Sequence, residues 1–221
     1  MPETPLYPSY VDLDPYIDVE WLRSLDGFVK ERLMRRLDAS GDLAFYTGPF
    51  LLNADSPALP GSRLVHLSRT AGKDDYYDLD KPDLWRLTPE AEEFAPLIAF
   101  IGSLPFEATG RMIIMYDFNA RPVSAHRDHD SVDLCHEFVW FRTNLAKPFY
   151  MLDPATGERR YVGSHSAWFD TVNQYHGADA GSGLSFSIRV DGRFTDAFRR
   201  HIPTAPDNLA SAPALWAAAA A

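Results

Sequence analysis

The chain has 221 residues, of which 46% are hydrophobic, enough for one well-packed core and too few for two. Its 21 basic and 31 acidic residues give a formal net charge of -10, which repels nucleic-acid phosphates and anionic lipid surfaces. We therefore expect a single domain over residues 1–221 that binds neither nucleic acid nor a membrane.

The chain carries no sign of export. Cys135 is its only cysteine, which excludes an intrachain disulfide. The N-terminal residues lack the basic start and apolar run of a signal peptide, and no apolar stretch is long enough to span a membrane. The sequence thus favours a cytoplasmic protein.

The first hundred residues predict two helices. Residues 1–17 are rich in Pro and Tyr and should run extended over the surface. Asp18 is a suitable N-cap, and the apolar residues after it recur every three or four positions, which predicts an amphipathic helix over residues 19–37. A second helix should follow Thr88, because Pro89 suits the first helical turn.

The segments between these helices are shorter. Residues 43–46 and 63–68 have the composition of strands, whereas the polar residues 71–85 are either an ordinary surface connection or a lid over an active site. We expect residues 1–109 to support a catalytic core that follows them.

From residue 110 the pattern changes to short β runs separated by turns. These runs cover residues 112–118, 134–143, 149–152, 159–162, 168–175 and 184–190. Closely spaced runs of this kind are typical of a sandwich or barrel rather than of βαβ units. We predict a mainly β (α+β) fold with a double-stranded β-helix core, also called a jelly-roll or cupin-like core, over residues 110–193. The Ala-rich residues 203–221 should form a disordered tail.

Three polar residues point to a metal site. His126 and Asp128 are separated by one residue, so in an extended segment they project to the same side, and His176 lies in a later β run. Two imidazoles and one carboxylate form the facial triad of non-haem Fe(II) oxygenases. The neighbouring His129 and Asp130 point apart in an extended segment and are expected to be loop residues.

Arg189 is the candidate partner for an organic acid. It alternates with Ser187 and Asp191 on one side of the last β run, while apolar residues occupy the other side. If this polar side faces the barrel interior, the guanidinium can bind a carboxylate in a bidentate manner, and Ser187 can add a hydrogen bond. If it faces outward, Arg189 forms a surface salt bridge with Asp191. Other cations would then take its role, namely Arg121, Arg142 and Arg193.

The sequence resembles the aspartyl/asparaginyl β-hydroxylase-like branch of the Fe(II)/2-oxoglutarate-dependent dioxygenases. The resemblance covers roughly residues 110–193 and depends on five short runs: 111–116, 126–128, 140–144, 170–176 and 189–191. It implies a double-stranded β-helix with Fe(II) bound by His126, Asp128 and His176, and with 2-oxoglutarate held by Arg189. Asp128 occupies a position where some members carry glycine, which favours hydroxylation over halogenation.

The implied activity is hydroxylation of an amino acid, free or within a peptide, or of a related small molecule, with O2 and 2-oxoglutarate as cosubstrates. His136 is either a buried core histidine or a contact to the cosubstrate or substrate. The candidates for the substrate pocket are Tyr116, Trp140, Arg142 and Asn173. Two other functions stay open: a cupin-like isomerase or hydrolase with a non-redox metal, and a jelly-roll binding module without catalysis.

Overall fold

The computed structural model describes residues 10–40, 62–70, 82–128, 137–153, 156–171 and 174–202. Its N-terminal part contains β1 (Tyr10–Asp12), η1 (Asp14–Tyr16), α1 (Val19–Ser24), α2 (Asp26–Ser40), β2 (Ser62–His66), β3 (Ser68–Thr70), η3 (Pro82–Leu84), β4 (Trp85–Leu87), α3 (Pro89–Glu93) and α4 (Ala95–Ile101). The remainder contains β5 (Phe106–Asp117), β6 (Val123–His126), β7 (Phe138–Phe141), β8 (Phe149–Leu152), β9 (Arg159–Tyr161), β10 (Ser166–Phe169), β11 (Tyr175–Ala178), β12 (Ser185–Phe194) and α5 (Asp196–Arg199).

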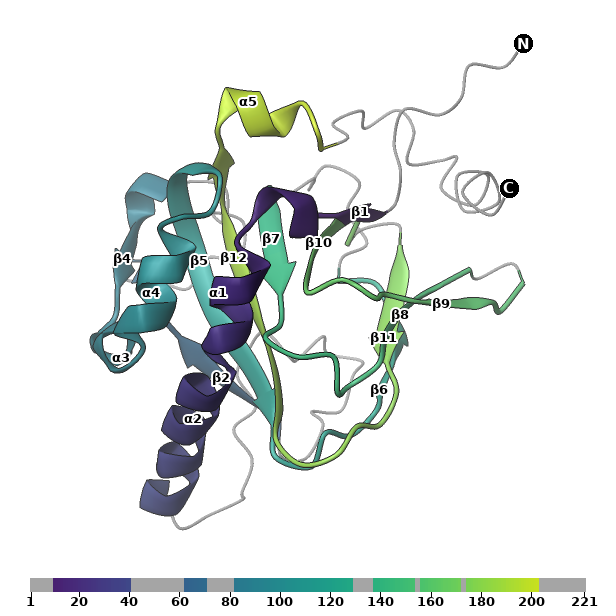
Figure 1. Ribbon diagram of the computed structural model, residues 1–221, viewed down its shortest axis with the longest axis horizontal. Helices are drawn as coiled ribbons and strands as arrows, with labels where there is room; N and C mark the ends of the chain where they lie inside the picture. The colour runs from purple at the N-terminus through teal and green to yellow at the C-terminus, as the bar shows by residue number, and fades with distance from the viewer. Residues whose placement is uncertain are drawn as a thin grey trace.

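Two antiparallel sheets form the body of the protein (Figure 1). The large sheet has the strand order β1-β10-β7-β12-β5-β2, and the small sheet has the order β6-β11-β8-β9. From β5 onward the chain crosses repeatedly between them, since β5, β7, β10 and β12 belong to the large sheet and β6, β8, β9 and β11 to the small one. This alternation is the double-stranded β-helix that the sequence predicts.

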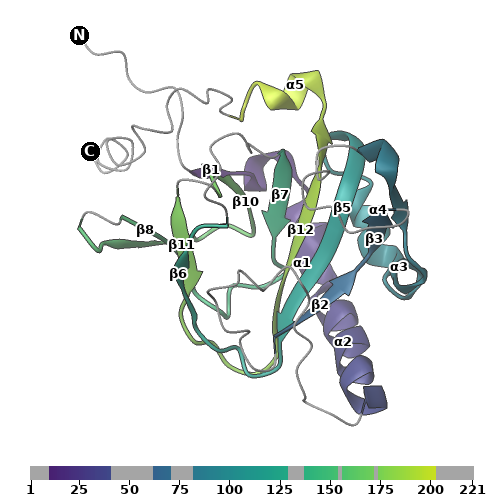
Figure 2. The ribbon, with the colours of Figure 1, turned by 180° about the vertical axis from the view of Figure 1, so that it is seen from behind.

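Helices cover the outer face of the large sheet, and the small sheet lies on its other side, as both views show (Figures 1 and 2). The side chains that the sheet directs toward the helices are fully buried, among them Ile114, Phe141 and Ile188. The ring of Phe141 packs edge-on against Phe100 of α4 at 5.4 Å between centroids. The main hydrophobic core therefore lies between the helices and the large sheet, which leaves the inner face for the site.

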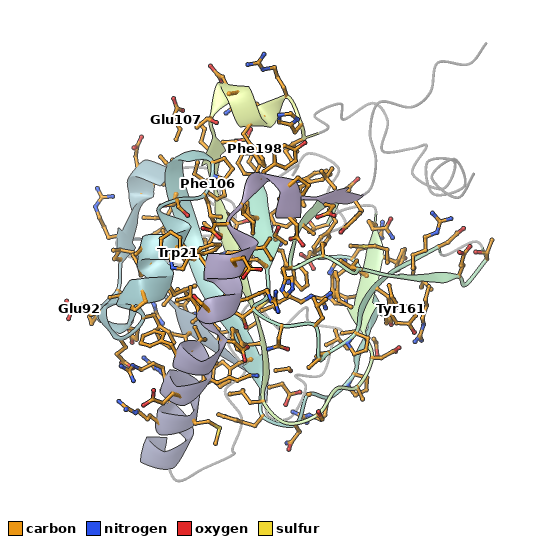
Figure 3. All side chains as sticks on the ribbon, in the orientation of Figure 1. Trp21, Glu92, Phe106, Glu107, Tyr161 and Phe198 are labelled. Atoms are coloured by element: carbon orange, nitrogen blue, oxygen red, sulfur yellow. The ribbon has the colours of Figure 1, made fainter. Side chains whose placement is uncertain are left out.

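Figure 3 labels side chains on the helical layer and on the small sheet. Trp21 on α1 packs edge-on against Phe100 at 5.5 Å on the helical side, whereas Tyr161 on β9 projects from the far end of the small sheet and is 57% exposed. Phe106 stacks on Phe194 of β12 at 4.8 Å between ring centroids, and Phe198 of α5 packs edge-on against Phe194 at 4.8 Å, which joins α5 to the end of β12. Figure 3 labels Phe106 and Phe198.

Both predicted helices begin where the sequence indicates, but each is broken. The Asp18 side chain accepts a hydrogen bond from the backbone N–H of Trp21 at 2.9 Å, as an N-cap does. Leu25 then separates α1 from α2, and Phe94 separates α3 from α4. Leu25 is 6% exposed and Phe94 is fully buried, so each break directs an apolar side chain into the core.

The strand predictions need two corrections. The run 168–175 is not one strand: it contains the end of β10 and the start of β11, which belong to different sheets. β1, β3, β4 and β6 were not predicted, because each has only three or four residues. The expected strand 43–46, most of the loop 71–85 and the tail 203–221 lie outside the described residues. Among the described helices, none has the length and apolar character needed to cross a lipid bilayer.

Candidate metal centre

The pairing of β6 with β11 brings the two predicted histidine ligands together. His126 lies directly opposite His176 in the antiparallel register, with ring centroids 4.5 Å apart. Asp128 follows two residues after the end of β6, where its backbone N–H donates to the carbonyl oxygen of Thr171 at 2.8 Å. The potential ligand atoms of the three residues all lie within 4.8 Å of one another, which is compatible with one shared metal ion.

Backbone carbonyls orient both imidazoles toward Asp128. Nδ1 of His126 lies 2.8 Å from the carbonyl oxygen of Ser124, and Nδ1 of His176 lies 3.1 Å from that of Gln174. A carbonyl oxygen only accepts, so in each ring Nδ1 carries the proton and donates. In the neutral form of an imidazole the lone pair is then on Nε2, and this atom lies 3.6 Å (His126) and 3.3 Å (His176) from Oδ1 of Asp128. This is the usual arrangement of metal-binding histidines.

The charges of the three groups also suit a cation. Burial alone would raise the pKa of the Asp128 carboxyl, but the His176, Arg189 and His126 side chains outweigh burial and hold this pKa well below its usual range. Burial, together with the neighbouring His176, lowers the pKa of His126 against the opposing effect of Asp128. At neutral pH the site thus presents a carboxylate and an uncharged His126 ring, the protonation states in which these groups bind metals.

The two oxygens of Asp128 have different neighbours. Oδ1 faces the two imidazole Nε2 atoms, whereas Oδ2 accepts a hydrogen bond from Nη1 of Arg189 at 2.9 Å. Two nitrogens and one carboxylate oxygen would therefore meet an ion from one side, and the donor set fits a divalent first-row transition metal with open coordination positions.

Arg189 faces the barrel interior, so its side chain is buried and only 6% exposed. It lies opposite Ile113 of β5 and Trp140 of β7, and its guanidinium stacks on the ring of Phe138 at 4.1 Å. The expected pairing with Asp191 is also present, with Nε donating to Oδ1 at 2.9 Å. This ion pair is buried rather than on the surface.

An aromatic cluster adjoins the triad. Trp140 stacks on Phe149 at 4.4 Å between centroids, and the rings of Phe149 and Phe169 lie 5.9 Å and 4.8 Å from that of His176. Trp140 lies on the inner face, because it is directly opposite Arg189 in the sheet. Ser187 shares the face of Arg189 and is partly exposed.

Tyr116, predicted to line the pocket, lies on a different face of the sheet from Arg189. It lies opposite Phe186 in the β5–β12 pair, three positions from Ile113, which is opposite Arg189. Because side chains alternate along a strand, Tyr116 points to the other face of the large sheet. There its ring packs against Phe118 in the main core.

Arg142 is bound by backbone carbonyl groups. Its buried guanidinium donates to the carbonyl oxygens of Lys147, Val162 and Ser164 at distances of 2.5 to 3.3 Å. These bonds tie two loops together, and this use of its donors favours a structural role over a contact to substrate. Among the other fallback cations, Arg121 pairs with Asp117, and Arg193 pairs with Glu107 at the surface.

His136 and Asn173 lie outside the described residues, as do His129 and Asp130. Sequence reasoning missed the aromatic residues Phe149 and Phe169 beside His176, and Arg111, which donates to Asp191 through Nε at 2.9 Å. Their only sequence signal is alternation within short β runs, which does not tell the inner face from the outer one.

Fold and site together define a double-stranded β-helix protein with two histidines and one aspartate placed to bind a metal ion. Neither a protein-family model nor a curated protein matches the sequence. Solved structures with a similar fold include a prolyl-4-hydroxylase from Pseudomonas putida, with 13% identity, 85% of this chain and 94% of that chain covered, and a TM-score of 0.43.

AviO1 from Streptomyces viridochromogenes Tue57 is similar at 16% identity, with 86% of this chain and 91% of that chain covered and a TM-score of 0.45. A prolyl hydroxylase from Trichoplax adhaerens, solved with a peptide fragment of the hypoxia inducible factor oxygen degradation domain, is 10% identical, with 90% and 88% covered and a TM-score of 0.47. At these identities the similarity concerns the fold alone.

Proposed function

We propose that this protein is an Fe(II)- and 2-oxoglutarate-dependent dioxygenase that hydroxylates an unactivated C–H bond of an amino acid, free or within a peptide, or of a related small molecule. The observation that carries the proposal is the convergence of Nε2 of His126, Nε2 of His176 and Oδ1 of Asp128, with each Nδ1 held by a carbonyl. Non-haem Fe(II) oxygenases use this donor set.

In this function His126, Asp128 and His176 would hold the iron. When bound, the iron supplies the reaction with O2 that is coupled to decarboxylation of 2-oxoglutarate to succinate. The chain itself would orient the reactants. The aromatic side chains of Trp140, Phe149 and Phe169 give the triad an apolar border on one side.

We assign the carboxylate of 2-oxoglutarate to the polar inner face of β12. Arg189 is buried and cationic, and Ser187 lies two residues before it on the same face and is partly exposed. A carboxylate that approaches past Ser187 would therefore meet the guanidinium. Trp140 is our candidate for a substrate contact from the described residues, and His136 and Asn173 remain candidates outside them.

The test measures succinate release by the Fe(II)-loaded protein with 2-oxoglutarate, O2 and a panel of amino acids and peptides. His126→Ala should abolish succinate formation, and its fold should survive because the His126 side chain is 43% exposed. His201→Ala, which removes an exposed histidine at the end of α5, is the matched control and should keep the activity.

Succinate formation by His126→Ala at the wild-type rate would contradict the proposal. Activity of Zn(II)- or Mn(II)-loaded protein without O2 or a 2-oxo acid would instead indicate a cupin-like isomerase or hydrolase. Failure of the purified protein to bind any of these metals would indicate a binding module without catalysis.

A further inference from the structure

Four charged side chains form a continuous series that ends at the metal site. Nε of Arg111 donates to Oδ2 of Asp191 at 2.9 Å, and Oδ1 of Asp191 accepts from Nε of Arg189 at 2.9 Å. Nη1 of Arg189 then donates to Oδ2 of Asp128 at 2.9 Å. The signs alternate along the series, so its four formal charges cancel.

The series connects the two sheets. Arg111 lies on β5, and Asp191 and Arg189 lie on the adjacent β12, all within the large sheet, whereas Asp128 follows β6 of the small sheet. The side chains of Arg111, Asp191 and Arg189 are only 3%, 1% and 6% exposed. The contacts among these three side chains are therefore shielded from water, whereas Asp128 is 21% exposed.

Stability alone does not account for such a series. Buried ion pairs cost desolvation energy that their mutual attraction offsets only in part, and apolar residues of similar volume often stabilise a fold equally well. The series does fix the orientation of the Arg189 side chain. The guanidinium of Arg189 is planar and rigid, so the hydrogen bond from Nε to Asp191 fixes where Nη1 points.

This direction determines how Asp128 can bind a metal. Because Oδ2 is engaged by Nη1 of Arg189, the carboxylate presents only Oδ1 to the two imidazoles. The stacking of the guanidinium on Phe138 at 4.1 Å further restricts its movement. The side chain of Asp128, a candidate metal ligand, is thus held by residues outside the candidate triad.

We propose that Asp191 and Arg111 are positioning residues of the metal centre, which hold Arg189 against Asp128 so that this carboxylate binds the metal through Oδ1 alone. The inference rests on the proposed function only in taking the triad as the metal site. It gives Arg189 a role that precedes any contact with 2-oxoglutarate.

Asp191→Asn is the most informative variant, because the loss of orientation and the change in charge should both weaken metal binding. The amide binds Arg189 more weakly than the carboxylate does, and the lost negative charge gives the series a net positive charge near a cation site. Removal of Arg189 itself is less decisive, since the loss of orientation is opposed by the loss of a repelling charge.

The experiment titrates the protein anaerobically with Co(II) alone, without 2-oxoglutarate, and records affinity and the visible absorption of the bound ion. Asp191→Asn should weaken Co(II) binding by about 10- to 100-fold, the usual effect of losing a partner that orients a metal ligand. It should also change the absorption spectrum, because a released Asp128 can bind through both oxygens.

Arg142→Gln is the matched control. It also removes a buried arginine, but one that binds backbone carbonyls and not the series. We expect lower stability with unchanged Co(II) affinity. If Asp191→Asn loses its cooperative unfolding transition, Arg189→Lys is tested in its place. Lysine keeps the positive charge but cannot bridge Asp191 and Asp128 as the planar guanidinium does. We expect the same weakening of Co(II) binding.

Wild-type affinity and spectrum in Asp191→Asn, or in Arg189→Lys where that variant replaces it, would overturn the inference. The outcome is separate from that of the proposed function. A protein that binds Co(II) with the expected dependence on Asp191 but never consumes 2-oxoglutarate supports the inference and contradicts the function. Turnover of 2-oxoglutarate by the wild type, with unchanged Co(II) affinity in the variants, would support the function and contradict the inference.

Discussion

Gly177 shows how closely the strands pack around the candidate metal ligands. It follows His176 on β11, between β6 and β8. A Cβ atom at this position would lie 2.6 Å from the hydroxyl oxygen of Tyr150 and 2.7 Å from the carbonyl oxygen of Val123. Both distances are far below van der Waals contact, and one of the two atoms belongs to the backbone of the strand that carries His126.

We predict that Gly177→Ala destabilises the protein by about 1–3 kcal/mol, as other insertions into packed interiors do, and weakens Co(II) binding. The reason is that the methyl group pushes β6 away from β11 and so separates His126 from His176. Urea unfolding and Co(II) titration measure the two effects.

Gly163→Ala is the control for this prediction, because a Cβ atom at Gly163 meets nothing within 4 Å. Adding Tyr150→Phe to Gly177→Ala should recover part of the stability but little of the metal affinity, since the Val123 carbonyl remains in the way. Wild-type Co(II) affinity in Gly177→Ala would show that the packing between these strands does not position the ligands.

At the scale of elements, one side chain joins the helical layer to the barrel. Oδ1 of Asp26, at the start of α2, accepts hydrogen bonds from the side chains of Thr143 and Asn144, each at 2.5 Å, while Oδ2 pairs with Lys30 at 2.8 Å. Burial acts to raise the pKa of Asp26, but these three partners lower it on balance. The carboxylate therefore connects α2 to the connection between β7 and β8.

Asp26→Ala should lower the free energy of unfolding by about 2 kcal/mol, because hydrogen bonds to a charged group are stronger than neutral ones and two partners on another element lose their acceptor. Glu31→Ala, which removes an exposed i,i+4 pair with Arg35 on the same helix, should change it by less than about 0.5 kcal/mol. Chemical denaturation compares the two. Equal effects would mean that Asp26 acts only within α2.

These elements also show what the sequence can predict. Caps and periodicity indicate helix starts, because Asp18 and Pro89 act on the turn that follows them. The breaks at Leu25 and Phe94 have no such signal, since apolar side chains that fit the core determine them. The run 168–175 reads as one strand because residues 170–174 contain neither Gly nor Pro.

The site divides in the same way. The candidate triad was predicted from residue types and spacing, and the fold brings its three members together. The contact between Arg189 and Asp128 joins residues 61 positions apart and depends on how two sheets face each other. The face that Tyr116 occupies follows from the register between β5 and β12, which local alternation does not determine.

At the scale of the whole molecule, the candidate metal centre lies where the two sheets meet. The small sheet supplies His126 and His176, and the large sheet supplies Arg189, which reaches the Asp128 carboxylate. Each ligand is held by a backbone or side-chain partner in the described structure. A metal ion therefore binds the folded chain far better than the unfolded one, which couples metal binding to global stability.

We therefore predict that Co(II) at a free concentration 100 times its dissociation constant raises the free energy of unfolding by about 2.7 kcal/mol, which for a chain of this size raises the melting temperature by about 5–10 °C. Differential scanning calorimetry with and without the ion measures the shift, and excess chelator should reverse it. His126→Ala should show no shift in melting temperature at the same Co(II) concentration, because the variant lacks one of the three ligands. The His126 side chain is 43% exposed, so its removal should leave the fold intact. A shift of equal size in wild type and His126→Ala would mean that the ion stabilises the protein at a different place, and the triad would lose its assignment as the metal site.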